Sequence, residues 1–171
     1  MLVLETRRLA LRHATLDDDD FILRLLNEPS FLRFIGDRGV RTHDDARRYI
    51  GERLIGSYER NGFGLWVVVR KETPSPIGIC GLVKRDALPD PDIGFAFLPE
   101  HWRCGYAFES AAAVKAYALE TLALPRLFAV TNPDNVGSIR IVEKLGLVFE
   151  RMIALTPNEP EVRLFALPAP S

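Results

Sequence analysis

Three apolar segments follow one another in the middle of the chain and constrain the fold more than any other feature. Residues 65–70 are almost continuously apolar, residues 77–83 are apolar with two glycines, and residues 92–98 form the third segment. Runs of this length and composition predict buried strands. A turn at residues 73–76 and a proline-rich loop at residues 88–91 connect them. The segments therefore predict an antiparallel meander at the centre of a sheet.

The chain changes character at residues 101–113, where an irregular segment of bulky side chains leads into an alanine-rich helix predicted over residues 107–122. The apolar face of this helix recurs at helical spacing and comprises Ala111, Val114, Ala118 and Leu122. Gly105 precedes the first turn, whose N–H groups lack intrahelical partners, and a glycine lets a ligand approach the backbone. This arrangement suits an anionic group such as a phosphate, although a glycine before a helix is more often a simple turn.

The C-terminal third has the order strand, turn, helix and then two strands. Residues 127–130 predict the first strand, Asn135 caps the helix, and Gly146 ends it. Residues 147–153 and 162–167 predict the two final strands. Successive strands followed by strand–loop–helix units are typical of a mixed α+β fold.

The N-terminal third predicts one strand and two helices. Residues 8–13 alternate apolar and polar side chains, as in a half-buried strand. Thr15 and Thr42 are suited to cap the two helices, because aspartates follow each in the first turn. We assign the aspartates at residues 17–20 to solvated capping and not to a metal site, because consecutive side chains on a helix splay apart. Residues 31–35 are expected to form a short turn.

Composition places the chain among ordinary folded proteins, and its 171 residues suit a single domain over residues 1–171. Hydrophobic residues make up 47%, charged residues 26%, and the net charge is -1. This balance offers no broad basic surface for nucleic acid, and no apolar run approaches a membrane span. Cys80 and Cys104 form no metal or redox spacing, and the early charges do not fit a secretory signal. We expect a cytoplasmic protein with reduced thiols and a frayed tail at residues 168–171.

Three segments occur together in an order and spacing that identify a family resemblance. The first is ETRRLALR at residues 5–12, and the second runs from IGF at residues 93–95 through PEHWRCGYAFE at residues 99–109. The third runs from NVGS at residues 135–138 through EKLGL at residues 143–147. Together they resemble the GNAT superfamily of acyl-CoA-dependent N-acetyltransferases, most closely its RimJ/RimL-type branch. The resemblance covers nearly the whole chain.

The resemblance implies a GNAT fold, in which a mostly antiparallel sheet splays into a V with helices on both faces. Acetyl-CoA would be the cosubstrate, with its pantetheine arm in the opening and its pyrophosphate on the loop that opens the alanine-rich helix. No metal is implied. The positions that match the family's cofactor-binding residues are Phe97, Leu98, Arg103, Cys104, Gly105, Tyr106, Ala107, Asn135 and Ser138. Phe97 and Leu98 would bind through main-chain groups, and Asn135 from the opposite side.

The resemblance also implies that an amine attacks the thioester directly, without an acyl-enzyme. The leaving CoA thiolate gains from a proton donor, which in many family members is a tyrosine of the last helix. Val142 stands at that position here, so Ser138 is the candidate donor, although a first-turn serine also suits simple helix capping. Glu159 is the candidate base. Its alternatives are Glu161, His101, Glu100 and Glu109, and each of these also fits a surface or capping role.

The expected partners are acetyl-CoA and a primary amine, either a protein N-terminal α-amine or a small-molecule amine. Residues 31–45 and 156–161 would build the acceptor pocket. Converging acidic residues there would favour a polycationic acceptor, and a narrow apolar slot would favour a peptide terminus. The competing hypothesis is a CoA-binding sensor or interaction module with little or no turnover, which the missing tyrosine keeps open. We expect a monomer or homodimer that binds neither nucleic acid nor membrane.

Overall fold

The computed structural model describes residues 1–168, so residues 169–171 of the tail predicted to be frayed lie outside the described part. The strands are β1 (Leu2–Glu5), β2 (Leu9–Arg12), β3 (Leu65–Arg70), β4 (Pro76–Val83), β5 (Asp92–Phe97), β6 (Phe128–Thr131), β7 (Val148–Ile153) and β8 (Val162–Ala166). The helices are α1 (Asp19–Leu26), α2 (Pro29–Phe34), α3 (His43–Tyr49), α4 (Gly56–Asn61), α5 (Tyr106–Ala116) and α6 (Val136–Lys144). Shorter 3₁₀ or π segments are η1 (Leu16–Asp18), η2 (Ile50–Ile55), η3 (Pro99–His101) and η4 (Tyr117–Thr121).

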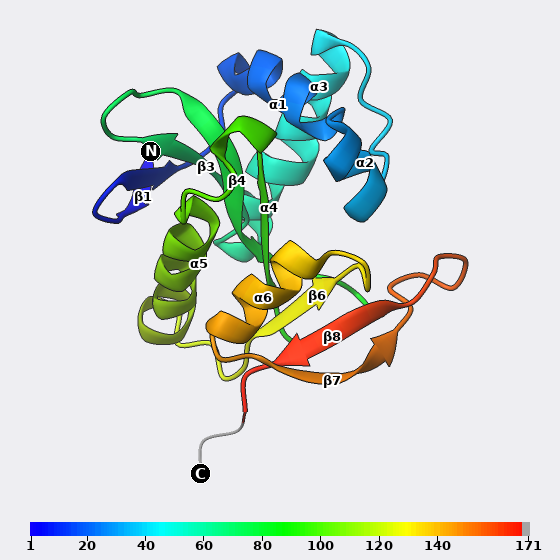
Figure 1. Ribbon diagram of the computed structural model, residues 1–171. Helices are drawn as coiled ribbons and strands as arrows, with labels where there is room; N and C mark the ends of the chain where they lie inside the picture. The colour runs from blue at the N-terminus through cyan, green and yellow to red at the C-terminus, as the bar shows by residue number, and fades with distance from the viewer. Residues whose placement is uncertain (169–171) are drawn as a thin grey trace.

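All eight strands belong to one sheet in the order β1-β2-β3-β4-β5-β6-β8-β7 (Figure 1). The meander predicted for β3, β4 and β5 is confirmed, because each strand pairs antiparallel with the next. β5 and β6 are parallel and are paired only where Asp92 lies beside Phe128. Beyond that point the two strands diverge, which gives the sheet the predicted V shape.

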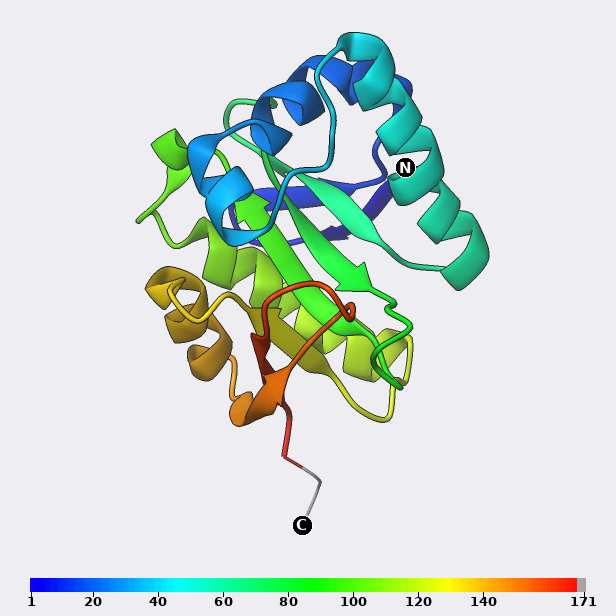
Figure 2. The ribbon, with the colours of Figure 1, turned by 90° about the vertical axis from the view of Figure 1, so that its right-hand side faces the viewer.

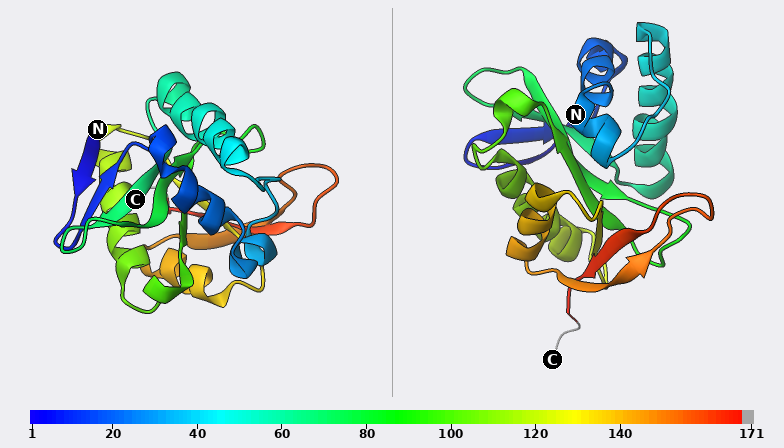
Figure 3. Two further views of the ribbon diagram at one scale, coloured as in Figure 1. Left: turned by 90° about the horizontal axis from the view of Figure 1, so that it is seen from above. Right: turned by 45° about the vertical axis from the view of Figure 1, so that its right-hand side comes forward.

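Helices cover both faces of the sheet, as the resemblance implied (Figures 2 and 3). α5 packs on β4 and β5, and α6 packs beside it against β6. The continuous helical segment formed by α3, η2 and α4 lies with α1 and α2 on the other face. The buried face of the long helix contains Ala111, Val114 and Ala118, as its periodicity predicted.

Local signals fixed several boundaries. The Thr42 hydroxyl accepts a hydrogen bond from the Asp45 N–H at 3.0 Å and begins α3, as expected of an N-cap. Asn135 does the same for α6 by accepting from the Ser138 N–H at 3.2 Å, and Gly146 follows that helix with a φ of +94°. The predicted N-terminal, central and C-terminal strands are present, and β1 is an additional edge strand.

Two local predictions are wrong. Residues 31–35 belong largely to α2 and not to a turn, because Pro29 occupies the first helical position, where its fixed φ suits a helix. Asp18 is not solvated: its carboxylate is buried and accepts two hydrogen bonds of 2.9 Å from the Arg12 guanidinium. Sequence spacing gave the position of this aspartate on the helix but could not show that β2 brings an arginine to it.

Candidate functional site

The segment that joins β5 to α5 presents a concave run of backbone N–H groups. Arg103 and Gly105 both have left-handed backbone conformations, with φ of +61° and +81°. The first intrahelical bond of α5 runs from the Glu109 N–H to the Gly105 carbonyl at 3.0 Å. The N–H groups of Tyr106 and Ala107 therefore precede the hydrogen-bonded turns and are open to a ligand. Alternating backbone conformations at a helix start form the type of nest that binds anions.

Two side chains make hydrogen bonds that hold the β5–α5 segment in place. The Trp102 Nε1–H donates to the Phe97 carbonyl at 2.9 Å, which ties the loop to the end of β5. The Cys104 thiol is exposed and donates to the Trp102 carbonyl at 3.4 Å. Both cysteines of the chain are free thiols, as expected, and Cys80 is buried.

An ion pair from the N-terminal hairpin holds the start of α5. Arg8 Nε lies 2.7 Å from Glu109 Oε1, and the Arg8 guanidinium stacks over the Tyr106 ring at 4.5 Å. Burial acts to raise the pKa of Glu109, but hydrogen bonds from Thr6 and Arg8 outweigh it and lower this pKa. Glu109 is thus committed to a structural pair at the loop and does not line the cleft described below.

The edge of β5 that faces β6 has free main-chain groups. Leu98 donates its N–H to the Ile77 carbonyl at 3.0 Å, which defines the hydrogen-bonded positions of the β4–β5 ladder. Because these positions alternate in an antiparallel pair, the main-chain groups of Ile93, Phe95 and Phe97 point away from β4. Next to Asp92 this edge is still paired with β6, and from Phe95 onward it faces the opening of the V, where β6 has diverged.

Of the two residues predicted to bind through their main chain, Phe97 is the one that keeps a free group on this edge. That group is its N–H, because its carbonyl already accepts from the Trp102 Nε1–H at 2.9 Å. The Leu98 N–H is used by β4, and its carbonyl accepts from the His101 N–H at 2.9 Å. The Phe97 ring lies over Gly78, where an added Cβ would come within 2.4 Å of the ring. The glycine in β4 is therefore required to seat this phenylalanine.

A cleft of about 610 Å³ occupies the opening between β5 and β6. It extends from the β5 edge to α6, which contributes Asn135, Ser138 and Val142. The long β7–β8 loop contributes Thr156 and Glu159. Ser138, Glu159 and Asn135, predicted as site residues from separate parts of the sequence, thus share one cavity. The Val142 side chain is buried in the wall. Because it is a valine, this position supplies no hydroxyl.

The cleft also contains a carboxylate that sequence reasoning missed. Asp92 opens β5 at the base of the V and is only 1% exposed. Its Oδ1 lies 2.8 Å from Arg85 Nε, while Oδ2 has no hydrogen-bond partner within residues 1–168. Burial raises the pKa of Asp92 to about 6, against the opposing effect of Arg85. The available sequence signal was an acidic residue at the start of an otherwise apolar strand.

The other predicted bases lie elsewhere. Glu100 is exposed and paired with Arg24 at 2.6 Å, and neither Glu161 nor His101 lines the cleft. On the opposite wall, the buried Thr131 hydroxyl of β6 has no hydrogen-bond partner in the described part of the chain. Across residues 1–168 no group of three or more histidine, cysteine or acidic side chains is arranged to hold a metal.

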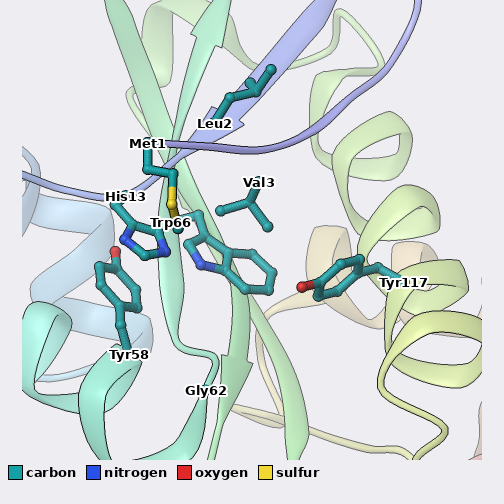
Figure 4. A pocket seen from close by; sticks show the side chains of 8 residues that line it. All are labelled: Met1, Leu2, Val3, His13, Tyr58, Gly62, Trp66 and Tyr117. Carbon is teal, nitrogen blue, oxygen red and sulfur yellow. The ribbon is translucent and has the colours of Figure 1, made fainter.

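A second cavity, of about 300 Å³, lies between the N-terminal hairpin, β3 and two helices (Figure 4). His13 stacks on Tyr58 with ring centroids 4.2 Å apart, and burial lowers the pKa of His13. The Trp66 Nε1–H, buried beside this cavity, has no hydrogen-bond partner among residues 1–168. This cavity is separate from the cleft between β5 and β6, since the two share no lining residue.

Comparison with known proteins agrees with this geometry. Residues 8–148 match the family model described as "Acetyltransferase (GNAT) domain". The uncharacterized N-acetyltransferase YoaA of Bacillus subtilis is 31% identical over 155 residues, which cover 88% of this chain and 85% of that protein. The chain therefore belongs to the GNAT acetyltransferase family.

Solved structures support the same fold. An acetyltransferase from Agrobacterium tumefaciens superposes with a TM-score of 0.80 at 26% identity, covering 95% of this chain and 92% of that one. The RimL ribosomal alpha-N-protein acetyltransferase in complex with coenzyme A superposes with a TM-score of 0.83 at 14% identity. That match covers 99% of this chain and 98% of the other. Within residues 1–168, no helix has the length and apolar character needed to cross a membrane.

Proposed function

We propose that this protein transfers an acetyl group from acetyl-CoA to a primary amine by direct attack. The observation that carries the proposal is the free edge of β5, which leads from the N–H nest at Gly105 to the buried Asp92 at the base of the cleft. A long, extended donor such as acetyl-CoA needs a continuous line of hydrogen-bonding groups of this kind. The three motif segments favour a RimJ/RimL-type enzyme, and the charged N-terminal segment, which does not fit a secretory signal, favours the cytoplasm.

The residues present fit acetyl-CoA. The anionic pyrophosphate suits the N–H nest, whose residues are Arg103, Cys104, Gly105, Tyr106 and Ala107. The amide groups of the pantetheine arm suit the N–H of Phe97 and the main-chain groups of Phe95, and Asn135 reaches the arm from α6. Because the nest binds through the backbone, Cys104 can replace a basic residue there at modest cost.

Bound acetyl-CoA supplies a thioester, whose carbon–sulfur bond breaks as the acceptor nitrogen bonds to the acetyl carbon. We assign the proton released by that nitrogen to Asp92, whose second oxygen is free and whose pKa of about 6 leaves it ionised at neutral pH. The Ser138 hydroxyl, half-buried in the facing wall, is assigned to protonate the departing thiolate. Glu159 is exposed at the rim and is the alternative base.

An α-amine requires less of this base than a lysine does. Its reference pKa of about 7.7–8.0 leaves a substantial neutral fraction near pH 7, whereas lysine at about 10.4 is almost wholly protonated. A protein N-terminus or a small α-amine is therefore the acceptor that the site activates with least help.

Two measurements on the same sample test the proposal. Calorimetric titration with acetyl-CoA should show binding, and addition of amine acceptors should then release CoA thiol. Binding without thiol release across a broad panel of peptides and small amines would favour the sensor function, for which the buried Val142 is the supporting observation. Absence of binding would reject both functions.

A further inference from the structure

The lining of the cleft carries an excess of positive charge, which we call the cationic wall. Its cations without a carboxylate within 4.0 Å, as judged over residues 1–168, are Arg38, Arg53, Arg60 and Lys84. Among the described residues, the carboxylates of the cleft that have no cation within 4.0 Å are Asp86 and Glu159. Asp92 is already paired with Arg85. A cleft with four free cations and two free carboxylates is notable in a chain whose net charge is -1.

Two of these arginines line the cleft together with a tyrosine. Tyr49 of α3 contributes to the same lining as Arg38 and Arg53, and burial raises the pKa of Tyr49 against the opposing charges of the two arginines. A tyrosine hydroxyl and guanidiniums are all hydrogen-bond donors that suit an anionic group.

Two of these cations belong to the face of the molecule opposite the N–H nest. Arg53 and Arg60 lie on η2 and α4, which cover one face of the sheet, whereas Gly105 opens α5 on the other face (Figure 3). None of residues 97–108 lines the cleft. The phosphates of acetyl-CoA, held at the nest, would therefore lie away from the cationic wall.

We infer that the acceptor is an amine with negative charge close to its amino group, such as an acidic amino acid or a peptide terminus followed by acidic residues. The inference rests on the proposed function and names its substrate class. A carboxylate of the acceptor pairs with the cationic wall while the amine points toward Asp92. A polyamine meets repulsion from the same wall. Among the described residues that line the cleft, the unpaired cations outnumber the unpaired carboxylates, which is the opposite of the acidic pocket expected for a polycationic acceptor.

A charge series of acceptors tests the inference. Three peptides that begin Ser-Asp-Asp, Ser-Asn-Asn and Ser-Lys-Lys but are otherwise identical should show kcat/KM falling in that order. Free glutamate, glutamine and spermidine provide the matching small-molecule series and separate the two sources of acidic acceptor. Raising the ionic strength should lower kcat/KM for the acidic peptide and leave that of the neutral peptide nearly unchanged.

Variants assign the preference to this wall. Arg53→Gln should lower kcat/KM for the acidic peptide roughly fivefold with little effect on the neutral one, and Arg53→Lys should restore most of it. Arg53→Glu should reverse the order of the acidic and basic peptides. Arg48→Gln is the matched control, because Arg48 is an exposed arginine of α3 outside the cleft.

The outcomes separate this inference from the proposed function. Turnover that is equal for the three peptides, or highest for the basic one, overturns the acidic-acceptor inference and leaves the acetyltransferase intact. An Arg53→Gln effect on the Kd of acetyl-CoA, with the acceptor preference unchanged, assigns the cation to the donor and also overturns the inference. No turnover of any acceptor overturns both.

Discussion

Arg85 and Asp92 form an ion pair that uses only one of the two carboxylate oxygens. The 2.8 Å contact joins Arg85 Nε to Asp92 Oδ1, and Oδ2 has no hydrogen-bond partner in the described residues. An unpaired buried carboxylate oxygen is costly, so its presence at the base of a cleft needs an explanation. Under the proposed function, the acceptor nitrogen that releases its proton would be a transient partner of this oxygen.

The first prediction concerns the pH dependence of catalysis. Both the acceptor amine and Asp92 must be deprotonated, so log kcat/KM for an α-amine should rise with a slope near two below about pH 6, rise with a slope near one up to about pH 8, and then level off. Asp92→Asn should lower kcat/KM by about 10²–10⁴-fold and leave a slope near one at every pH below about 8. The profile is measured by thiol release between pH 5 and 9.

Two control variants make this assignment specific. Arg85→Gln removes the cation that opposes the effect of burial, so the acidic limb should move to higher pH. Glu159→Gln should leave the limb in place. If Glu159→Gln removes the limb and Asp92→Asn retains it, Glu159 is the base.

The second prediction assigns the proton donor. Ser138→Ala should lower kcat by about 10²-fold, a larger effect than any weakening of acetyl-CoA binding, because the hydroxyl acts on the leaving thiolate. Thr131→Val is the matched control, because Thr131 also lines the cleft and its hydroxyl has no hydrogen-bond partner among the described residues. A larger loss of kcat in Thr131→Val than in Ser138→Ala would transfer the role to Thr131.

The third prediction tests the N–H nest. Gly105→Val should weaken acetyl-CoA binding by at least tenfold, because Gly105 has a φ of +81° and an added Cβ would lie 3.2 Å from Arg8 Nη2. Gly62→Val imposes a similar backbone conformation, at φ +75°, with no neighbour within 4 Å. Calorimetric titration of both variants separates loss of the nest from general strain, and equal affinities would show that the nest is misplaced.

The fourth prediction concerns stability. Arg12→Gln should lower the free energy of unfolding by about 2 kcal/mol at pH 7, because Asp18 keeps a buried carboxylate without its guanidinium partner. Burial acts to raise the pKa of Asp18, but hydrogen bonds from Arg12 and Thr15 dominate and lower it. A lowered folded-state pKa stabilises the fold above the unfolded-state value and ceases to do so as pH falls through the folded-state value.

The difference between Arg12→Gln and the unchanged protein should therefore shrink below about pH 4. Urea unfolding at several pH values measures it. Arg48→Gln, which removes an exposed pair with Asp45, should change stability by less than about 0.5 kcal/mol at every pH. A pH-independent difference for Arg12→Gln would contradict the role of the Asp18 charge.

Features encoded in short stretches of sequence were predictable. The apolar runs of β3, β4 and β5 identified the meander, and Thr42 and Asn135 identified helix starts, because a cap depends on neighbouring residues alone. The N-terminal edge strand β1 was missed, since its pairing with β2 depends on a turn and not on a distinctive apolar run.

The chemical character of individual side chains was less predictable. Asp18 and Asp92 are ordinary acidic residues in the sequence, and their burial depends on arginines that the fold brings beside them. The positive wall of the cleft likewise combines the segment after α2, η2, α4 and the loop after β4, which are distant in sequence. Such properties arise from tertiary contacts and have no local periodicity.

The use of backbone groups at the nest and side chains at the opposite wall divides the protein into two independently variable parts. Substitutions at residues 103–107 can accumulate while the donor is still held, provided the backbone retains its conformation. Substitutions in the segment after α2, on η2 and on α4 change the chemistry of the cleft without disturbing that backbone. Under the proposed function, new acceptor specificities could therefore evolve by substitutions in the cleft, with the donor-binding backbone inherited unchanged.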